Sequence, residues 1–477
     1  ISEQRVSPQF ADYLASGTFI FTAKPDKSNP EHPFPADHTK VTGARPLLLC
    51  PTLRRLVSGF LAVRYTVHNR RLYSEKLQFG LIASGTEAAT RDVLLTVDLK
   101  PPTNAVVGVD IKNAHTTLAR LAAFMVLSRR YAETGHALDL AALKYFLLFY
   151  RSFNVRYIKV GKQYRAVFQT DGLDQGEAMA SHIFGFTIAD IMDRIFAPKV
   201  IDCGRLFVHD DTTLTGEIFC PPTPNAVMPT TTSPSITPLP YAVELFAYIL
   251  LHYMRTTLAD GKTVCFQPFL PAGHPCLASR AAHLFPAGTK FSSTSYKLAG
   301  CDIATTATFP APLAKAVTAY SLLLNRLINL PILTAQAKMI GLVISYRPSA
   351  RYGHHMRYLP PSITTMLPLP PSPANPDGLP YAAALRNLGI DAVAAILRKP
   401  ARELLDSPAC DGILTRLGFP SANSGIGMSC LELISESCYI SSFAATLPLH
   451  LMNPFLAPYL SDAHNWRLSR SVFISAT

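Results

Sequence analysis

His209, Asp210 and Asp211 form the densest group of residues in this sequence that could support acid–base or metal chemistry. They lie together in "VHDDTT" (208–213). An imidazole beside two carboxylates could hold a divalent metal ion or exchange protons with a substrate. Adjacent residues of a strand point to opposite faces, however, so the two carboxylates would not readily share one metal ion. A polar turn is the simpler interpretation.

A second stretch, "SYRPSARYGHHMRY" (345–358), contains cations and aromatic residues without any acid. Its paired histidines, His354 and His355, could bind a metal ion, but no Asp, Glu or Cys partner stands at ligand spacing. Cations with aromatics between them suit phosphate contact and base stacking. The alternative is a loop whose arginines bind carbonyl or carboxylate groups of a neighbour. The cations assigned here to nucleic-acid contact are Arg347, Arg351 and Arg357.

A third stretch, "VRYIKVGKQYRAVFQT" (155–170), has the same character. Two alternating runs flank Gly161 and Lys162, which predicts an antiparallel hairpin with a tight turn. Arg156 and Lys159 fall on opposite faces of the first strand, which favours a half-buried hairpin at the rim of a basic surface over a dedicated phosphate grip. The cations proposed to contact nucleic acid are Arg156, Lys159, Lys162 and Arg165.

Short motifs that accompany known catalytic mechanisms are absent. The sequence has no phosphate-binding loop, no G-x-G-x-x-G, no H-E-x-x-H, no G-x-S-x-G and no "GDD". The nine cysteines include no C-x-x-C pair, which indicates free thiols rather than a disulfide framework or a zinc site. We therefore predict that the protein is not an enzyme and needs no cofactor and no metal ion.

The positive charge is concentrated in one part of the chain. Residues 40–165 hold 20 Lys and Arg against 7 Asp and Glu, an excess of 13, while the remainder holds 44 − 20 = 24 bases and 32 − 7 = 25 acids. A localised basic field is typical of a protein with a polyanionic partner. The alternative is a solvated face whose acids are supplied by another lobe or subunit.

The composition is apolar for a chain without a membrane span. Mean hydropathy is +0.19, yet no run of about 18 apolar residues lacks charge or proline, so we expect no membrane association. An apolar surplus of this kind indicates surface that is buried against other subunits.

The elements that would position these residues are mostly helical. Apolar residues recur at helical spacing in several segments, and "DVLLTVDLK" (92–100), which ends at Pro-Pro, is predicted to be a strand. The predicted fold class is mainly α (α+β), with short strands and hairpins. The predicted helices cover residues 115–135, 140–153, 174–197, 241–260, 312–330 and 381–399.

Proline-rich segments divide the chain into predicted domains. We expect an extended N-terminal arm (1–43), a helix-rich domain (44–219 and 241–358), a proline-rich excursion (220–240), an exposed proline-rich loop (359–380) and a C-terminal helical segment (381–477). The excursion would protrude from the helix-rich domain. The C-terminal segment would pack on that domain or on a neighbouring subunit.

This organisation resembles the coat proteins of small double-stranded RNA viruses, particularly the partitiviruses. The features that carry the resemblance are the block "LAALKYFLLFYRSFNVRYIKVGKQYR" (140–165), the extended segment 22–40 and the proline-rich excursions. They are organisational features, so no residue role is carried over from the family.

The resemblance implies a helix-rich shell domain with a protruding insertion. It also implies homodimers that assemble into an icosahedral (T=1) shell around viral RNA and the viral polymerase. The expected location is the virion and the host cytoplasm, with nonspecific RNA contact on the inner surface.

Two other function classes stay open at this point. One is an RNA-binding nucleoprotein or clamp that does not form a shell. The other is a hydrolase or nuclease that uses His209 with Asp210 or Asp211, joined by His354 or His355.

Overall fold

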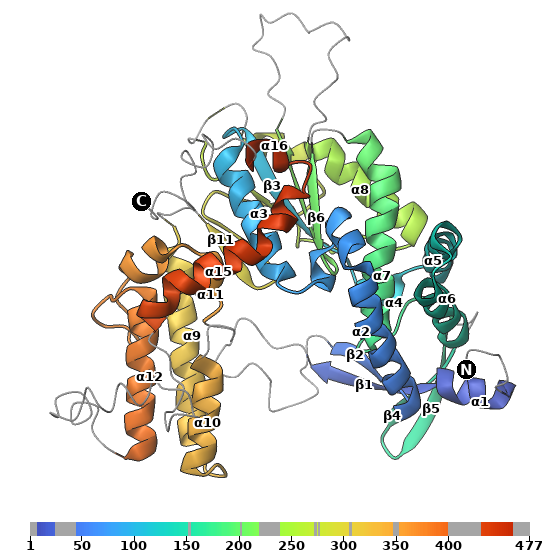
Figure 1. Ribbon diagram of the computed structural model, residues 1–477, viewed down its shortest axis with the longest axis horizontal. Coiled ribbons are helices and arrows are strands. Elements are labelled where there is room, and N and C mark those ends of the chain that lie inside the picture. Colours follow the sequence, from blue (N-terminus) through green and yellow to red (C-terminus); the bar gives the residue numbers. More distant parts are fainter. Residues whose placement is uncertain are drawn as a thin grey trace, which may run out of the picture. The chain divides into compact units, whose positions relative to one another are not determined.

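The computed structural model describes most of the chain, which divides into two units by its internal contacts. The first unit holds residues 1–89, 102–292 and 452–455, and the second holds 90–101, 293–451 and 456–477. Helices predominate and short strands form small sheets, so the predicted mainly α (α+β) class is confirmed (Figure 1). The described residues are 7–23, 44–150, 154–200, 203–218, 239–270, 274, 277–304, 308–346, 353–398 and 431–460.

A five-stranded sheet lies at the centre of the first unit, in the order β6-β7-β3-β8-β9. Its neighbouring strands are antiparallel except β8 and β9, which are parallel. The middle five residues of both β3 and β7 are buried, which requires cover on both faces of the sheet. The strands are β3 (Asn104–Asp110), β6 (Gly204–Val208), β7 (Asp211–Glu217), β8 (Val264–Phe266) and β9 (Lys290–Ser292).

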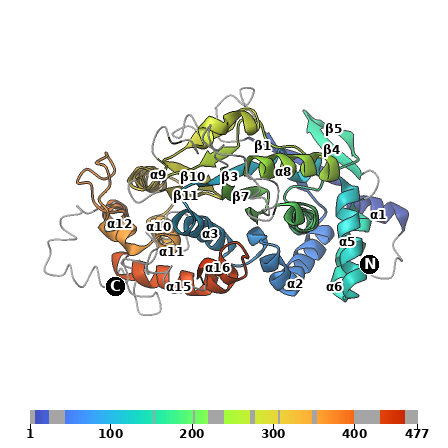
Figure 2. The same cartoon turned by 90° about the horizontal axis from the view of Figure 1, so that it is seen from above.

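The helices of the first unit pack around α7, which is buried along almost its whole length and contacts α2 and α5. A helix that is apolar on all sides belongs in the interior. Helices α5 and α6 lie side by side (Figure 2), and α5 ends at Gly135, whose φ of 61° supplies the left-handed cap that the sequence predicts. The longer helices are α2 (Thr52–Glu75), α5 (Arg120–Thr134), α6 (Ala137–Phe149), α7 (Ala178–Ile191) and α8 (Leu239–Met254).

Shorter helical turns complete this unit. They are α1 (Pro8–Ala15), η2 (Phe79–Leu81), α4 (Ala114–Thr117), η3 (Met192–Phe196), η4 (Ala197–Lys199) and η5 (Ala278–Leu284).

A second sheet of the first unit has the order β2-β1-β4-β5. β1 pairs antiparallel with β2 and parallel with β4, and β4 forms the predicted antiparallel hairpin with β5. The start of the predicted arm is therefore part of this unit, because α1 buries Leu14 and β1 joins the sheet; residues 24–43 lie outside the described part. The strands are β1 (Gly17–Ala23), β2 (Ala44–Leu49), β4 (Asn154–Val160) and β5 (Gln163–Gln169).

The second unit is a set of helices with one small hairpin. α9 packs against α12, α10 contacts both, and α15 packs against α11 and α12. The helix α3 (Gly85–Leu99) supplies residues 90–99 to this unit. The remaining elements are β10 (Ser295–Leu298), β11 (Cys301–Ala304), α9 (Pro310–Asn329), α10 (Ala335–Tyr346), α11 (His355–Tyr358), η6 (Ser362–Met366), α12 (Tyr381–Leu397), α15 (Leu431–Leu451) and α16 (Ala457–Leu460).

Three predictions about the elements need correction. Residues 92–100 are not a strand, because α3 runs through residue 99 and buries the consecutive residues Val93, Leu94 and Leu95. The predicted helix 115–135 is two helices, α4 and α5. The loop 359–380 is not uniformly exposed, because it contains η6 and its apolar residues Leu359, Ile363 and Leu369 are buried.

The unit boundary also differs from the predicted domains. Residues 293–358, which we placed with the helix-rich domain that begins at residue 44, belong with residues 381–451. Residues 220–238 of the predicted proline-rich excursion (220–240) lie outside the described part of the chain. Within the described residues, no helix is long and apolar enough to cross a membrane.

Candidate nucleic-acid interface and assembly surface

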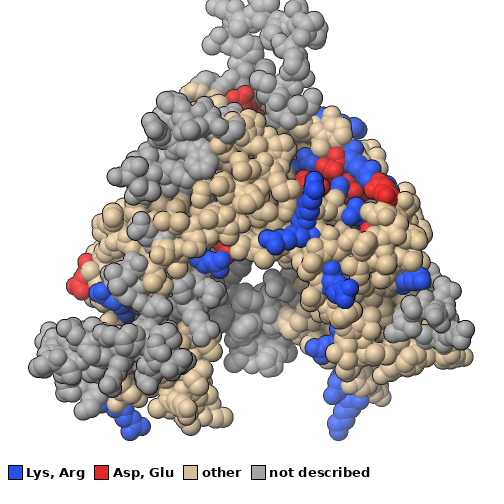
Figure 3. Space-filling view, in the orientation of Figure 1, with Lys and Arg blue, Asp and Glu red and all other residues tan. Residues whose placement is uncertain are grey.

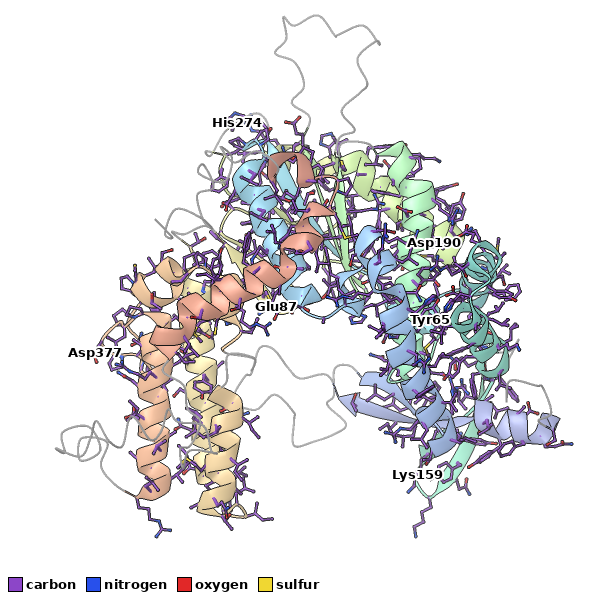
Figure 4. The ribbon with its side chains drawn as sticks, in the orientation of Figure 1. Tyr65, Glu87, Lys159, Asp190, His274 and Asp377 are labelled. Carbon is purple, nitrogen blue, oxygen red and sulfur yellow. The ribbon has the colours of Figure 1, made fainter. Side chains whose placement is uncertain are left out.

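The β4–β5 hairpin places three of its four predicted RNA-contacting cations in solvent. Lys159, Lys162 and Arg165 are exposed, and the side chain of Lys159 points away from the rest of the unit at the free end of the hairpin (Figure 4). None of the three forms an ion pair with an acid of the described residues, and basic atoms are seen there without acidic ones beside them (Figure 3). The turn follows the prediction, with Gly161 at φ 62°.

The outer part of the hairpin is more exposed than the predicted half-buried arrangement. Tyr157, Val160, Tyr164, Val167 and Phe168 each expose at least two fifths of their surface. Aromatic rings interleaved with cations on an exposed hairpin can stack on bases while the cations contact phosphates.

Arg156 is the exception, and its predicted nucleic-acid contact is wrong. Its side chain is 0% exposed, and its Nη2 lies 2.9 and 2.7 Å from the two carboxylate oxygens of Asp174. Nε donates to Gln169 at 2.9 Å, and Nη1 donates to the carbonyl of Ala15. Arg156 therefore anchors the base of the hairpin to the core and cannot reach a phosphate.

A buried charge network surrounds this anchor. Arg54 of α2, also fully buried, donates to Asp174 at 2.7 Å, so one carboxylate serves two guanidinium groups. Glu177 accepts hydrogen bonds from the hydroxyls of Tyr145 and Tyr150 at 2.8 and 3.0 Å. Burial raises the pKa of Glu177, opposed by Arg54. The network ties α2, α6 and β4 together beneath the hairpin.

Part of the basic excess in residues 40–165 is paired with acids that follow it in the chain, because four of its cations contact three of those carboxylates. This favours the alternative in which another part of the protein supplies the acids, and it leaves a smaller basic surface than composition predicts. Acidic and basic atoms are intermixed in Figure 3, in the region where Figure 4 labels Asp190. The pairs are Arg54 and Arg156 with Asp174, Lys76 with Asp190 and Asp193, and Arg129 with Asp190.

Helix α2 carries an apolar stripe that no described residue covers. The stripe consists of five side chains that are between 42% and 75% exposed, although the opposite face of the same helix packs against α6 and α7. Their spacing is 3, 4, 3 and 4 residues, which is the a/d pattern of a coiled coil. The stripe residues are Leu53, Leu56, Phe60, Val63 and Val67.

Two other helices of the first unit also expose apolar groups. On α5, Leu121 and Met125 are one helical turn apart and more than half exposed. On α8, Tyr248 and Leu251 are about half exposed. Contiguous exposed apolar surface is uncommon on soluble monomers and is typical of faces that contact other molecules. The apolar composition predicted that such surface exists, but it did not indicate which helices carry it.

The group around His209 is a turn, as the simpler interpretation predicts. His209 lies between β6 and β7 with φ 58°, its N–H donates to Gln78 Oε1 at 3.0 Å, and Gln78 donates back to the His209 carbonyl at 3.4 Å. Burial lowers the pKa of His209 and favours its neutral form. Asp211 begins β7 opposite Asp110 of β3.

Asp211→Asn is expected to stabilise the protein at pH 7 and to have little effect at pH 4. Burial, with the nearby carboxylates of Asp210 and Asp110, raises the pKa of Asp211 from 3.8 to about 6. The folded state therefore binds more protons than the unfolded state between these values, and the free energy of unfolding falls as pH rises through that window. Removing the charge should raise the free energy of unfolding by up to about 3 kcal/mol at pH 7. Urea unfolding at both pH values measures this difference.

The matched control for this change is Asp260→Asn, because the Asp260 side chain is 96% exposed. It should change the free energy of unfolding by less than about 0.5 kcal/mol at either pH. If Asp211→Asn raises the free energy of unfolding equally at pH 4 and pH 7, ionisation of the buried Asp211 carboxyl does not destabilise the folded state.

The second histidine group lies in the other unit. His354 Nε2 is 3.3 Å from the thiol of Cys301, and His355 Nδ1 is 3.1 Å from the hydroxyl of Tyr381. Arg357 is half-buried in α11, and its carbonyl accepts a hydrogen bond from Arg91 at 2.6 Å. Arg347 and Arg351 lie outside the described residues. Arg357 therefore belongs to the second unit, and the hairpin cations belong to the first.

One group of residues in the described part of the chain could hold a metal ion. Candidate ligand atoms of His68, His136 and Asp139 lie within 4.8 Å of one another. The Nδ1 of His136 already accepts the Leu138 N–H at 3.2 Å, so its Nε2 carries the proton in the neutral ring. Asp139 accepts from Thr134 at 2.6 Å. These contacts cap the start of α6. They occupy His136 Nδ1 and Asp139 Oδ2, so the three residues are poorly suited to bind a metal ion.

Comparisons with known proteins assign no family. No protein-family profile and no curated protein matches the sequence. Telomerase from Candida tropicalis matches with a TM-score of 0.41 and 13% identity, over 94% of this chain and 65% of that chain. Telomerase from Candida albicans with a telomeric RNA fragment matches with a TM-score of 0.39 and 12% identity, over 89% and 65%. A Candida tropicalis telomerase truncated from its C-terminal domain matches with a TM-score of 0.37 and 13% identity, over 63% of this chain and 55% of that chain.

These matches correct the prediction that the protein is not an enzyme. The chain spans 55% to 65% of the length of these telomerase chains, and telomerase is an enzyme. Our prediction rested only on the absence of short motifs, and a catalytic site can be built without them. The exclusion of enzymatic activity is therefore withdrawn. At these TM-scores the likeness carries no argument about what this chain does or which residues do it.

Proposed function

We propose that this protein is a self-assembling coat protein that encloses RNA, of the kind found in small double-stranded RNA viruses. The observation that carries the proposal is the uncovered apolar surface on α2, α5 and α8 of one unit. Burying such faces between copies removes apolar area from water, which is the dominant driving force of association. A coat protein needs several such contacts, because each copy in a shell has several neighbours.

Assembly of the purified protein tests this proposal directly. Expressed chain should elute as dimers or larger species in size-exclusion chromatography and should form closed particles in negative-stain electron microscopy. Apolar association tolerates salt, so particles should persist when ionic strength is raised. A stable monomer without particles at any salt concentration or pH would contradict the proposal.

The hairpin supports RNA contact inside such a shell. Lys159→Ala combined with Lys162→Ala is expected to leave folding and assembly intact and to lower RNA retention modestly. The slope of log affinity against log salt should fall by roughly one unit for each phosphate contact removed. Filter binding of a labelled oligonucleotide at several salt concentrations measures that slope.

Arg156→Ala separates the structural from the binding role of the hairpin cations. Like Lys159→Ala it removes one positive charge from β4, but from a buried anchor, so it should impair folding rather than change the salt slope of a folded protein. If the Lys159→Ala, Lys162→Ala double variant fails to assemble but its RNA affinity is unchanged, the role of the hairpin is structural and the RNA-contact proposal fails.

An RNA-binding nucleoprotein is the second candidate, favoured by the same exposed aromatic and basic hairpin. A nucleoprotein binds single strands tightly, with a steep salt slope from many phosphate contacts. A shell protein needs only weak affinity for naked RNA. Tight binding by protein that never forms particles would favour the nucleoprotein.

A further inference from the structure

One face of the β4–β5 hairpin carries all three of its aromatic rings, because residues paired across antiparallel strands share a face of the sheet. On this face Tyr157 is 40% exposed, Tyr164 60% and Phe168 66%. The opposite face is covered at the base of the hairpin, where Asn154 and Arg156 are buried. The pairs on the exposed face, which we call the ring face, are Val155 with Phe168, Tyr157 with Ala166, and Lys159 with Tyr164.

A hollow of about 520 Å³ adjoins the ring face where β4 meets β1. Thr18 of β1 pairs with Tyr157 on one side and with Leu49 on the other, and all three line the hollow. Tyr13 of α1, 60% exposed, contributes a further ring to its wall. Asp12 also lines the hollow but already has an interaction within the chain, and the binding of a base does not require it. The volume is within the range of about 300–1,000 Å³ that is usual for small-molecule sites.

We infer that the ring face binds unpaired bases of single-stranded RNA, with one base in the hollow beside Tyr157 and the phosphates along Lys159 and Lys162. The inference rests on the proposed function and names the form of RNA that the hairpin takes. Bases within a duplex are paired and stacked on one another, so exposed rings cannot reach their flat faces, whereas splayed bases of a single strand stack on such rings. Lys159 lies on the ring face itself, so a strand whose bases meet the rings brings its phosphates to this cation.

The spacing of the rings suits an extended strand. Tyr164 and Phe168 are the diagonal neighbours of Tyr157 across the hairpin, about 7–8 Å from it. Nucleotides of a helical strand rise by only about 3.4 Å each, so each ring takes a separate base of an extended strand. Ala166, directly opposite Tyr157, is too small to cover its ring. A purely apolar partner is disfavoured, because it would bury Lys159 on the same face without an acid.

Three labelled RNA probes and the full-length chain test the inference by fluorescence anisotropy. The probes are a short single-stranded oligonucleotide, a duplex with the same number of phosphates, and an abasic single strand of the same length. The wild type should bind the first probe at least about tenfold more tightly than the other two, because only the first offers bases for stacking.

Variants of the ring face separate stacking from phosphate contact. Tyr157→Ala combined with Tyr164→Ala should weaken single-strand binding by about tenfold or more. The slope of log affinity against log salt should stay constant, because no phosphate contact is lost. Tyr157→Phe combined with Tyr164→Phe keeps both rings and should bind as the wild type does.

The matched control is Val160→Ala combined with Val167→Ala. Both residues lie on the opposite face of the hairpin, and Val167 is exposed to the same 40% as Tyr157. This double variant should bind single-stranded RNA as the wild type does. Circular dichroism confirms that each variant is folded.

The outcomes separate this inference from the proposed function. Equal affinity for the three probes, or a Phe variant as weak as the Ala variant, overturns stacking on the ring face, while particle formation by the same protein would still support a coat protein. If the Ala variant forms no particles but binds RNA as the wild type does, the ring face contacts protein and the inference is wrong. If the wild type and the variants bind RNA as expected but never form particles, the inference holds and the coat-protein proposal fails.

Discussion

Replacing Asp174 with alanine is expected to destabilise the first unit by about 3–5 kcal/mol, because removing one member of a buried ion pair leaves the others uncompensated. Asp174 is the carboxylate that Arg54 and Arg156 share, and both guanidinium groups are fully buried. This loss is a large fraction of a typical domain stability of about 5–15 kcal/mol. Urea unfolding followed by circular dichroism measures it.

The control for Asp174 is Glu75→Ala. Glu75 pairs with Arg71 at 2.7 Å on the surface of α2, where the Arg71 side chain is 88% exposed. An exposed pair of this kind is worth less than about 1 kcal/mol. Equal effects of the two changes would show that the Arg54–Asp174–Arg156 network does not hold the hairpin to the core.

Arg91→Ala is expected to destabilise the second unit by about 3–4 kcal/mol, through a cavity and through polar groups left without their donor. Arg91 is fully buried in α3. It donates to Thr446 Oγ1 at 2.5 Å and to the Arg357 carbonyl at 2.6 Å. Its guanidinium lies 5.0 Å from the ring centroid of Phe443. One side chain thus joins α3, α11 and α15.

Hydrogen–deuterium exchange is the suitable measurement for Arg91→Ala, because a chain of two units need not unfold in one step. Peptides from α15 should exchange much faster in the variant, while peptides from α7 in the first unit should be unchanged. Lys297→Ala, at a side chain 65% exposed, is the control and should alter neither. Unchanged protection of α15 in Arg91→Ala would contradict the assigned role.

Local patterns predicted much of the secondary structure. Gly135 ends α5 because a glycine there adopts the left-handed conformation at no steric cost. Gly161 makes the β4–β5 turn for the same reason. The helix predicted over 312–330 begins two residues earlier, at Pro310, whose missing N–H has no helical partner to lose in the first turn. These signals depend only on the backbone preferences of one or two residues.

Longer-range features misled the prediction. Residues 92–100 alternate enough to resemble a strand, but packing in α3 buries Val93, Leu94 and Leu95 together, and tertiary burial overrides a short local pattern. The same holds for the loop 359–380, whose prolines indicated exposure although Leu359 and Ile363 are in the interior.

The sequence by itself determined that this protein is mainly helical, that its basic excess lies within residues 40–165, and that its composition is apolar. Only the tertiary structure decided which cations face solvent: Arg156 and Lys159 are three residues apart, yet one is buried against Asp174 and the other ends a free hairpin. The physical reason is that a charge is neutralised by whatever lies near it in space, and the spacing of residues along one strand does not specify that neighbour.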